Sequence, residues 1–175
     1  MKKTFIFLVL ITVLPLTLLG CHDVQEGLVP GNYEIEKNDT LHNNKEYSDG
    51  EIVYVPIYSS VFHSQSALNY ELTATLSIHN IDPDNPIQLI KADYYDTNGD
   101  LVEAYLEDVL ILKPLQVVQI VIHEEDNGST GAKFIVEWVS ETDVVSPIIE
   151  AVMVTIKGGQ GISFISPGRV IQHFD

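Results

Sequence analysis

The segment Glu71-Leu72-Thr73-Ala74-Thr75-Leu76-Ser77-Ile78-His79 decides the fold class. Apolar and polar residues alternate strictly along it, so that one face carries only Leu72, Ala74, Leu76 and Ile78. A period of two residues is the geometry of a β-strand with one buried face and one solvated face. The sequence therefore predicts a strand here that packs by its apolar face against a core.

From Glu51 onward the chain continues as short apolar segments separated by turn residues, and no segment predicts a helix. Asn98-Gly99 is a strong hairpin signal, and the segment 80–86 holds two prolines and four Asn or Asp residues, which favour a turn. Strands are predicted over 52–58, 71–79, 87–95, 101–106, 115–122, 134–139, 148–156, 162–165 and 169–171. Pro56 predicts an edge position for the first of them. Together they predict an all-β fold, an immunoglobulin-like antiparallel sandwich of two sheets and about eight strands, with Trp138 in its core.

The N-terminus has the features of an export signal. Lys2 and Lys3 precede a mostly apolar stretch over 5–19, which as a helix would be about 22 Å long and too short for a bilayer core of roughly 30 Å. The following Leu18-Leu19-Gly20-Cys21 resembles the lipobox of bacterial lipoproteins. That resemblance implies cleavage between Gly20 and Cys21 and attachment of palmitate-type acyl chains to Cys21. The alternatives are an ordinary secreted protein and an uncleaved N-terminal helix.

These signals predict three regions: a signal peptide over 1–20, a flexible polar tether over 21–48 and one β-sandwich domain over 49–175. The tether is predicted because residues 22–48 are polar and show no sustained period, and it would hold the domain roughly 30 Å from the lipid surface. Two acyl chains anchor a protein stably, whereas one does so only marginally. The expected location is the cell envelope, outside the cytoplasm, with the lipid on Cys21 in a membrane.

Charge and cysteine content restrict the partners. Removing residues 1–20 takes away two of the nine basic residues and none of the 25 acidic ones, which leaves a net charge of −18. A field of that sign repels nucleic acid, so no nucleic-acid partner is expected. Cys21 is the single cysteine, so no disulfide is expected, and no motif implies a cofactor.

A series of short motifs resembles a bacterial domain-of-unknown-function family that is often found in envelope lipoproteins. The resemblance covers about residues 51–172, and Lys133 departs from the smaller polar residue expected at its position. No activity is established for that family, so the resemblance implies no catalytic or binding residue. The motifs are Tyr54–Tyr58, Tyr94-Tyr95-Asp96, Gly131–Trp138, Glu150-Ala151-Val152-Met153, Gln160–Phe164 and Ser166-x-Gly168-Arg169.

Acidic residues near the predicted hairpin are candidate calcium ligands. Asp96, Asn98 and Asp100, with Glu107 eleven residues after Asp96, follow the oxygen spacing of a calcium loop. Leu101 stands where that loop requires glycine, and strands replace the flanking helices. The alternative is a hairpin tip with solvated carboxylates, although Asp82 and Asp84 could complete a different calcium site if they lay near Asp96.

Arg169 is the single arginine and the candidate anchor for a carboxylate or phosphate group of a ligand. The alternative is an ion pair with a neighbouring carboxylate of the chain itself. The six histidines show no spacing typical of a metal site, and the chain has no Gly-x-Ser-x-Gly elbow, so no metal site and no catalytic residue are predicted.

These observations predict a non-enzymatic binding or assembly module whose partner is an unknown envelope protein or a small ligand. The first alternative is a calcium- or small-ligand-binding domain that uses the acidic loops. The second is a hydrolytic enzyme, which would require a pocket with clustered titratable groups.

Overall fold

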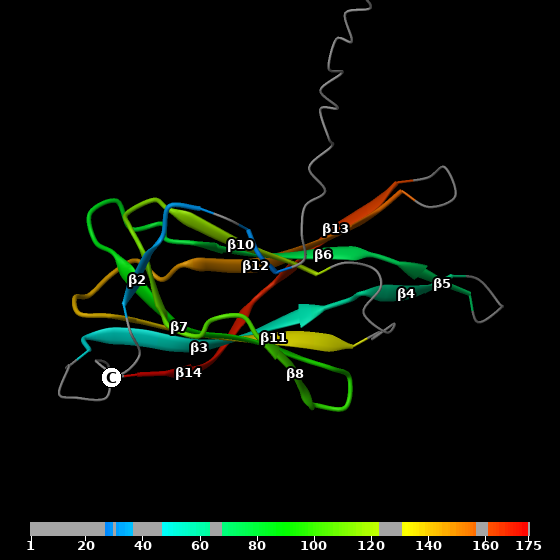
Figure 1. The fold of residues 1–175 in the computed structure, drawn as a ribbon, viewed down its shortest axis with the longest axis horizontal. Helices are drawn as coiled ribbons and strands as arrows, with labels where there is room; N and C mark the ends of the chain where they lie inside the picture. The colour runs from blue at the N-terminus through cyan, green and yellow to red at the C-terminus, as the bar shows by residue number, and fades with distance from the viewer. Residues whose placement is uncertain are drawn as a thin grey trace, which may run out of the picture.

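The computed structural model describes residues 27–29, 31–36, 47–63, 68–122, 131–156 and 161–174. Throughout these residues the chain is all-β and without helix, and its antiparallel sheets pack as a sandwich (Figure 1). Consequently none of the described segments is a helix that could cross a membrane. The predicted two-sheet antiparallel sandwich is confirmed.

Two large sheets form the layers, and the chain crosses between them several times. The five-stranded sheet has the order β1 (Gly27–Leu28), β10 (Val117–Ile122), β6 (Thr73–His79), β12 (Ile148–Thr155) and β13 (Ile162–Pro167). The seven-stranded sheet has the order β14 (Arg169–His173), β3 (Asp49–Ile57), β11 (Ala132–Ser140), β7 (Ile87–Tyr95), β9 (Val109–Leu112) and β2 (Glu34–Glu36), and β8 (Leu101–Ala104) also pairs with β7.

A small hairpin and a glycine make two of the crossings. The hairpin of β4 (Ser60–His63) and β5 (Leu68–Glu71) connects β3 to β6 and projects beyond the sandwich (Figure 1). Between β13 and β14 the Gly168 N–H donates to the Ile149 carbonyl at 2.8 Å. A Cβ at Gly168 would lie 2.7 Å from that carbonyl and from Val53 Cγ1, so this crossing requires glycine.

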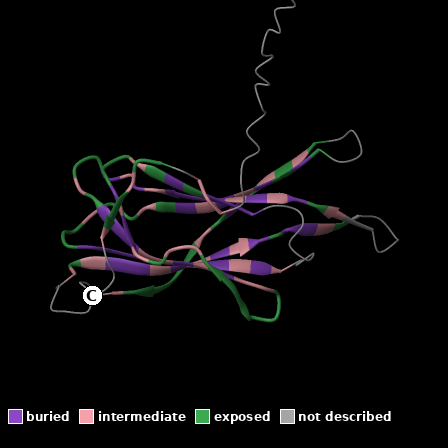
Figure 2. Cartoon of the chain, in the orientation of Figure 1, coloured by how far each residue is buried: buried purple, intermediate pink, exposed green. Residues whose placement is uncertain are grey.

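The core lies between the two sheets, and buried residues alternate with more exposed ones along most of their strands (Figure 2). The apolar face predicted from the alternation in 71–79 does pack against the core, because Leu72, Ala74, Leu76 and Ile78 are all buried. Trp138 is fully buried within the core, as predicted, and the ring centroids of Phe134 and Tyr94 lie 5.2 Å apart. Burial of these apolar groups is the main stabilising contribution to the fold.

A buried carboxylate closes one end of this core. Glu51 is 5% exposed, and its Oε2 accepts a hydrogen bond of 3.2 Å from the Trp138 indole N–H. Its Oε1 accepts one from the Ser146 hydroxyl at 3.4 Å and lies 3.4 Å from His173 Nδ1. The carboxylate thus has partners on both sides, as a buried charge requires.

The predicted turn over 80–86 is confirmed, and Asn80 is the residue that fixes it. Asn80 is 1% exposed, and its side-chain amide donates to the carbonyls of Asn85, Leu112 and Lys113 at 2.9, 3.1 and 3.0 Å. Its Oδ1 accepts the N–H of Asp82 at 3.0 Å. One side chain therefore joins this turn to the end of β9.

Asp82 extends the same network. Its carboxylate accepts backbone N–H groups from Asp84, Val145 and Asn85 at 2.9, 3.1 and 2.8 Å. These donors favour the charged form, so the backbone hydrogen bond from Asp84, followed by those from Val145 and Asn85, lowers the pKa of Asp82. The carboxylate therefore joins the 80–86 turn to the loop that carries Val145.

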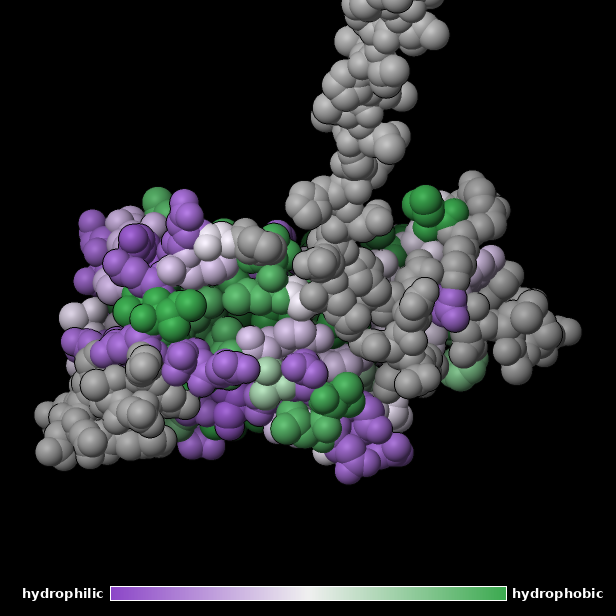
Figure 3. Space-filling view, in the orientation of Figure 1, coloured by the Kyte–Doolittle hydropathy of each residue, from purple (hydrophilic) through white to green (hydrophobic). Residues whose placement is uncertain are grey.

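The prediction of a flexible tether is wrong for part of 21–48, because β1 pairs with β10 and β2 pairs with β9. The physical reason is the burial of apolar groups, because Leu28 and Tyr33 pack against the core. The same burial raises the pKa of the Tyr33 hydroxyl. Apolar residues gather between the two layers along the edge facing the viewer in Figure 3, where β2 and β10 lie in Figure 1. Residues 27–29 and 31–36 cover part of that edge.

The strand count is also higher than predicted, with fourteen strands in the described residues instead of about eight. Besides β1 and β2, the sequence prediction missed β4, β5 and β9. The edge position predicted from Pro56 is found only around Pro56 itself. β14 pairs with β3 over Glu51–Tyr54 and does not reach Pro56. Over those four residues β3 is an interior strand.

Candidate functional site

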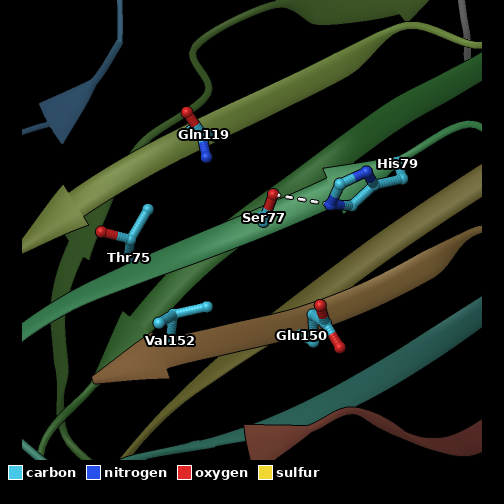
Figure 4. Close-up of a pocket in the computed structure, with 6 residues that line it drawn as sticks. All are labelled: Thr75, Ser77, His79, Gln119, Glu150 and Val152. Carbon is cyan, nitrogen blue, oxygen red and sulfur yellow. Dashed lines mark hydrogen bonds between the residues drawn. The ribbon is translucent and has the colours of Figure 1, made fainter. Parts of the chain in front are cut away.

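The outer face of the five-stranded sheet contains a shallow depression of about 400 Å³. Three neighbouring strands supply its lining, and their side chains point outward from the sheet (Figure 4). The lining residues are Thr75, Ser77 and His79 from β6, Gln119 from β10, and Glu150 and Val152 from β12.

Strand register creates this depression. Ser77 lies directly opposite Gln119 on β10 and Glu150 on β12, so the three form one row across the sheet. Opposite side chains in a sheet have Cβ atoms about 5 Å apart. Because the central residue is small and its neighbours are longer, Ser77 is only 5% exposed although it faces outward.

The site offers hydrogen-bonding groups around one carboxylate. Ser77 Oγ and His79 Nε2 share a hydrogen bond of 2.8 Å, in which the donor depends on the histidine tautomer. Glu150 is half-buried and is the only acidic residue in the lining. A carboxylate with neighbouring amide and hydroxyl groups suits a ligand group that is positively charged and carries N–H donors.

Apolar side chains surround the polar row on the same face. Val117 and Ile148 lie opposite His79 on the two flanking strands and are 37% and 47% exposed. Val154 on β12 and Ile165 on β13 are 44% and 59% exposed. The face therefore combines a few polar groups with a mostly apolar surround, which is the usual composition of small-molecule sites.

The arrangement does not form a hydrolytic triad. A triad requires an acid that orients the histidine through its second ring nitrogen. Here the residue opposite His79 on β12 is Ile148, whereas Glu150 lies opposite Ser77. Ser77 is also nearly inaccessible as a nucleophile.

Arg169 lies on β14, at an edge of the seven-stranded sheet and outside the depression. Its side chain is exposed, and it makes no ion pair with any carboxylate in the described part of the chain. The ion pair between Arg169 and a carboxylate of the chain, which was the alternative prediction, is therefore absent among those residues. Ligand binding by Arg169 stays a prediction.

The calcium candidates form a hairpin tip. Asp96 Oδ1 accepts the backbone N–H groups of Asn98, Gly99 and Asp100 at 2.8, 2.9 and 2.9 Å, and Lys133 donates to the Asp96 carbonyl. The hydrogen bond from the Asp100 N–H is the largest of the effects that lower the pKa of Asp96. The carboxylate is thus used to fix the turn, and Gly99 supplies its positive φ of 94°.

Asp82 and Asp84 do not join this tip. They precede β7, whereas Asp96 follows it, and the nine residues of β7 span roughly 30 Å. The predicted alternative, a calcium site that combines Asp82 and Asp84 with Asp96, is therefore wrong. Within the described residues no group of three or more His, Cys, Asp or Glu side chains is placed to hold a metal ion.

Gly20, Cys21 and the whole predicted signal peptide lie outside the described residues. The predictions of cleavage and lipidation there stay predictions. The sequence prediction also missed the row formed by Ser77, Gln119 and Glu150. The alternation in 71–79 did place Ser77 and His79 on the solvent face, but only the register of β10 and β12 shows what lies beside them.

Fold and site together define the class of this protein: an all-β antiparallel sandwich with an open polar depression on the outer face of one sheet. The chain belongs to the family described as "Protein of unknown function (DUF3124)", whose model matches residues 50–171. The resemblance to a family of unknown function is thereby confirmed, with nearly the expected bounds.

No curated protein matches the sequence. A similar solved structure is "Crystal Structure of Thermotoga maritima 1070", which is 8% identical, with 68% of this chain and 92% of that chain covered. Its TM-score of 0.42 is too low to support an argument about fold or function.

Proposed function

We propose that this protein is an extracytoplasmic lipoprotein of the cell envelope, anchored through acyl chains on Cys21, whose β-sandwich is a non-enzymatic binding or assembly module. Support for the anchor comes from the sequence: a short apolar stretch ends in Leu18-Leu19-Gly20-Cys21, and Cys21 is the only thiol. Two acyl chains of about fifteen methylenes, at about 0.8 kcal/mol each, would hold the protein at a membrane almost permanently.

The observation that carries the binding role is the row of Gln119, Ser77 and Glu150 on the outer sheet face. It presents the Gln119 amide and the Glu150 carboxylate within an apolar surround, which suits contact with a partner. Ser77 is 5% exposed and Glu150 does not lie opposite His79, so the same groups offer little for nucleophilic chemistry. A tethered module of this kind acts by raising the local concentration of whatever it binds.

The test of the anchor is intact mass and palmitate labelling of the wild-type chain and of Cys21→Ala, both expressed in a bacterium with the lipoprotein pathway. His22→Ala is the matched control, because it changes the adjacent residue and leaves the thiol. We expect a lipid mass in the wild type and in His22→Ala that is lost in Cys21→Ala. An unmodified Cys21, or a retained residue 1, would refute the anchor.

A second candidate function is the binding of a small organic cation in the depression, favoured by its single carboxylate, Glu150. Arginine amide is a suitable probe because it carries N–H donors and positive charge. A ligand at 100 times its Kd stabilises the native state by about 2.7 kcal/mol, so the melting temperature should rise with concentration. Glu150→Gln should abolish that rise, whereas Glu103→Gln on the exposed strand β8 should retain it. Equal responses of both variants would exclude the depression as the site.

A further inference from the structure

Exposed edge strands are sites of pairing with other chains, and proteins usually protect them with short length, charge or bulges. Four edges of the two large sheets have such protection. β1 has only two residues, and β2 carries Glu34 and Glu36. β8 carries Glu103 and begins beside a register shift in β7, while β14 carries Arg169 and a register shift of its own.

The remaining edge strand, β13, lacks this protection. Its six residues contain no charged side chain, and all six pair with β12 in unbroken register. Pro167 occupies only the last position. Within the described residues β12 is the one strand that pairs with β13 by hydrogen bonds, so every second residue directs its N–H and C=O groups away from the sheet.

The side chains beside this edge are apolar on the outer face. Ile165 is 59% exposed and lies opposite Val152, and Ser163 lies opposite Val154, which is 44% exposed. In a chain with a predicted net charge of −18 after cleavage, an uncharged strand of this length is a place where like-charged copies can approach.

We propose that β13 pairs antiparallel with β13 of a second copy about a two-fold axis, which joins the two five-stranded sheets into one continuous sheet. Antiparallel pairing of a strand with its own copy satisfies the self-complementarity that a two-fold interface requires. The depression lies on β6, β10 and β12, so this pairing leaves it open in both copies.

Interface size points to a dimer that depends on the membrane. Two six-residue strands bury well under the roughly 1,200 Å² of a stable interface, so the isolated domains associate weakly. The inference therefore rests on the proposed lipid anchor, which concentrates the copies in two dimensions.

Cysteine cross-linking in intact membranes tests the pairing, because lipidation leaves the chain without a free thiol. Ser163→Cys and Ile165→Cys are made in the full chain, singly and co-expressed, and oxidised with copper phenanthroline. Opposite residues of an antiparallel pair have Cα atoms about 4.5–5.5 Å apart, within disulfide range. Ile171→Cys is the matched control, since Ile171 is 60% exposed and lies on the bulged edge strand β14.

We expect a covalent dimer from at least one of the combinations 163–163, 165–165 and 163–165, at roughly ten times the yield of Ile171→Cys. Yields equal to that control, or adducts only with a protein of different mass, would overturn the pairing. A dimer formed by the wild-type chain would mean that Cys21 is a free thiol, which refutes the anchor. The same cysteines in a Cys21→Ala background at high protein concentration then decide the pairing independently.

Discussion

Replacing Asn80 by alanine should destabilise the sandwich more than any surface substitution. The variant loses three hydrogen bonds to carbonyls and one from the Asp82 N–H. At about 1 kcal/mol each these contribute about 4 kcal/mol, and hydration of the part-buried carbonyls reduces the expected loss to about 3 kcal/mol. For a domain of this size that corresponds to a fall in melting temperature of about 12 °C.

Urea unfolding followed by Trp138 fluorescence measures this loss, because the single tryptophan is fully buried and changes environment on unfolding. The urea slope m should be unchanged, so the whole effect appears as a lower midpoint. Asn98→Ala is the control, since Asn98 bonds only within the exposed hairpin tip and should cost less than about 0.5 kcal/mol. A loss below about 1 kcal/mol in Asn80→Ala would show that water replaces the amide and that the turn does not depend on it.

Three further predictions concern Gly168 between β13 and β14, the loss of stability at acid pH that involves Asp82, and the buried carboxylate of Glu51. Gly168→Ala should cost about 1–3 kcal/mol in urea unfolding because its Cβ meets backbone, whereas Gly161→Ala, with nothing within 4 Å, should be neutral. The folded pKa of Asp82 is lowered, so its stabilisation is full above about pH 4 and is lost as the pH falls through the folded pKa. A pH series of urea midpoints should therefore be flatter for Asp82→Asn below about pH 5. Trp138→Phe leaves Glu51 without its indole donor and should cost about 1–3 kcal/mol, measured by circular dichroism during heating.

The parts of the fold that the sequence predicted are those with a local signal. The alternation in 71–79 specifies both a strand and its buried face, and Asn98-Gly99 specifies a hairpin because Gly99 adopts a positive φ. β9 (Val109–Leu112) was missed because three of its four residues are buried, which leaves no alternation to detect. β2 (Glu34–Glu36) was missed because a three-residue polar strand forms only through backbone bonds to β9.

The candidate site was less accessible to sequence reasoning, for a related reason. Gln119, Ser77 and Glu150 come from three strands, and their proximity depends on the register of two separate strand pairs. A shift of one residue in either pair would move Gln119 or Glu150 to the core face. Side-chain type alone suggested the acidic loops, whose carboxylates at Asp82 and Asp96 are instead occupied by backbone donors.

The strand β1 changes what a lipid on Cys21 would do. With β1 beginning at Gly27, only six residue steps separate it from Cys21, a reach of at most about 20 Å instead of the roughly 30 Å expected from a longer free tether. An anchor at that position would hold the five-stranded sheet by its β1 edge, and β13 is the opposite edge of the same sheet. With such an anchor, the short connection would restrict the orientation of the domain and would leave the unprotected edge away from the attachment point, where a neighbouring anchored copy could pair with it.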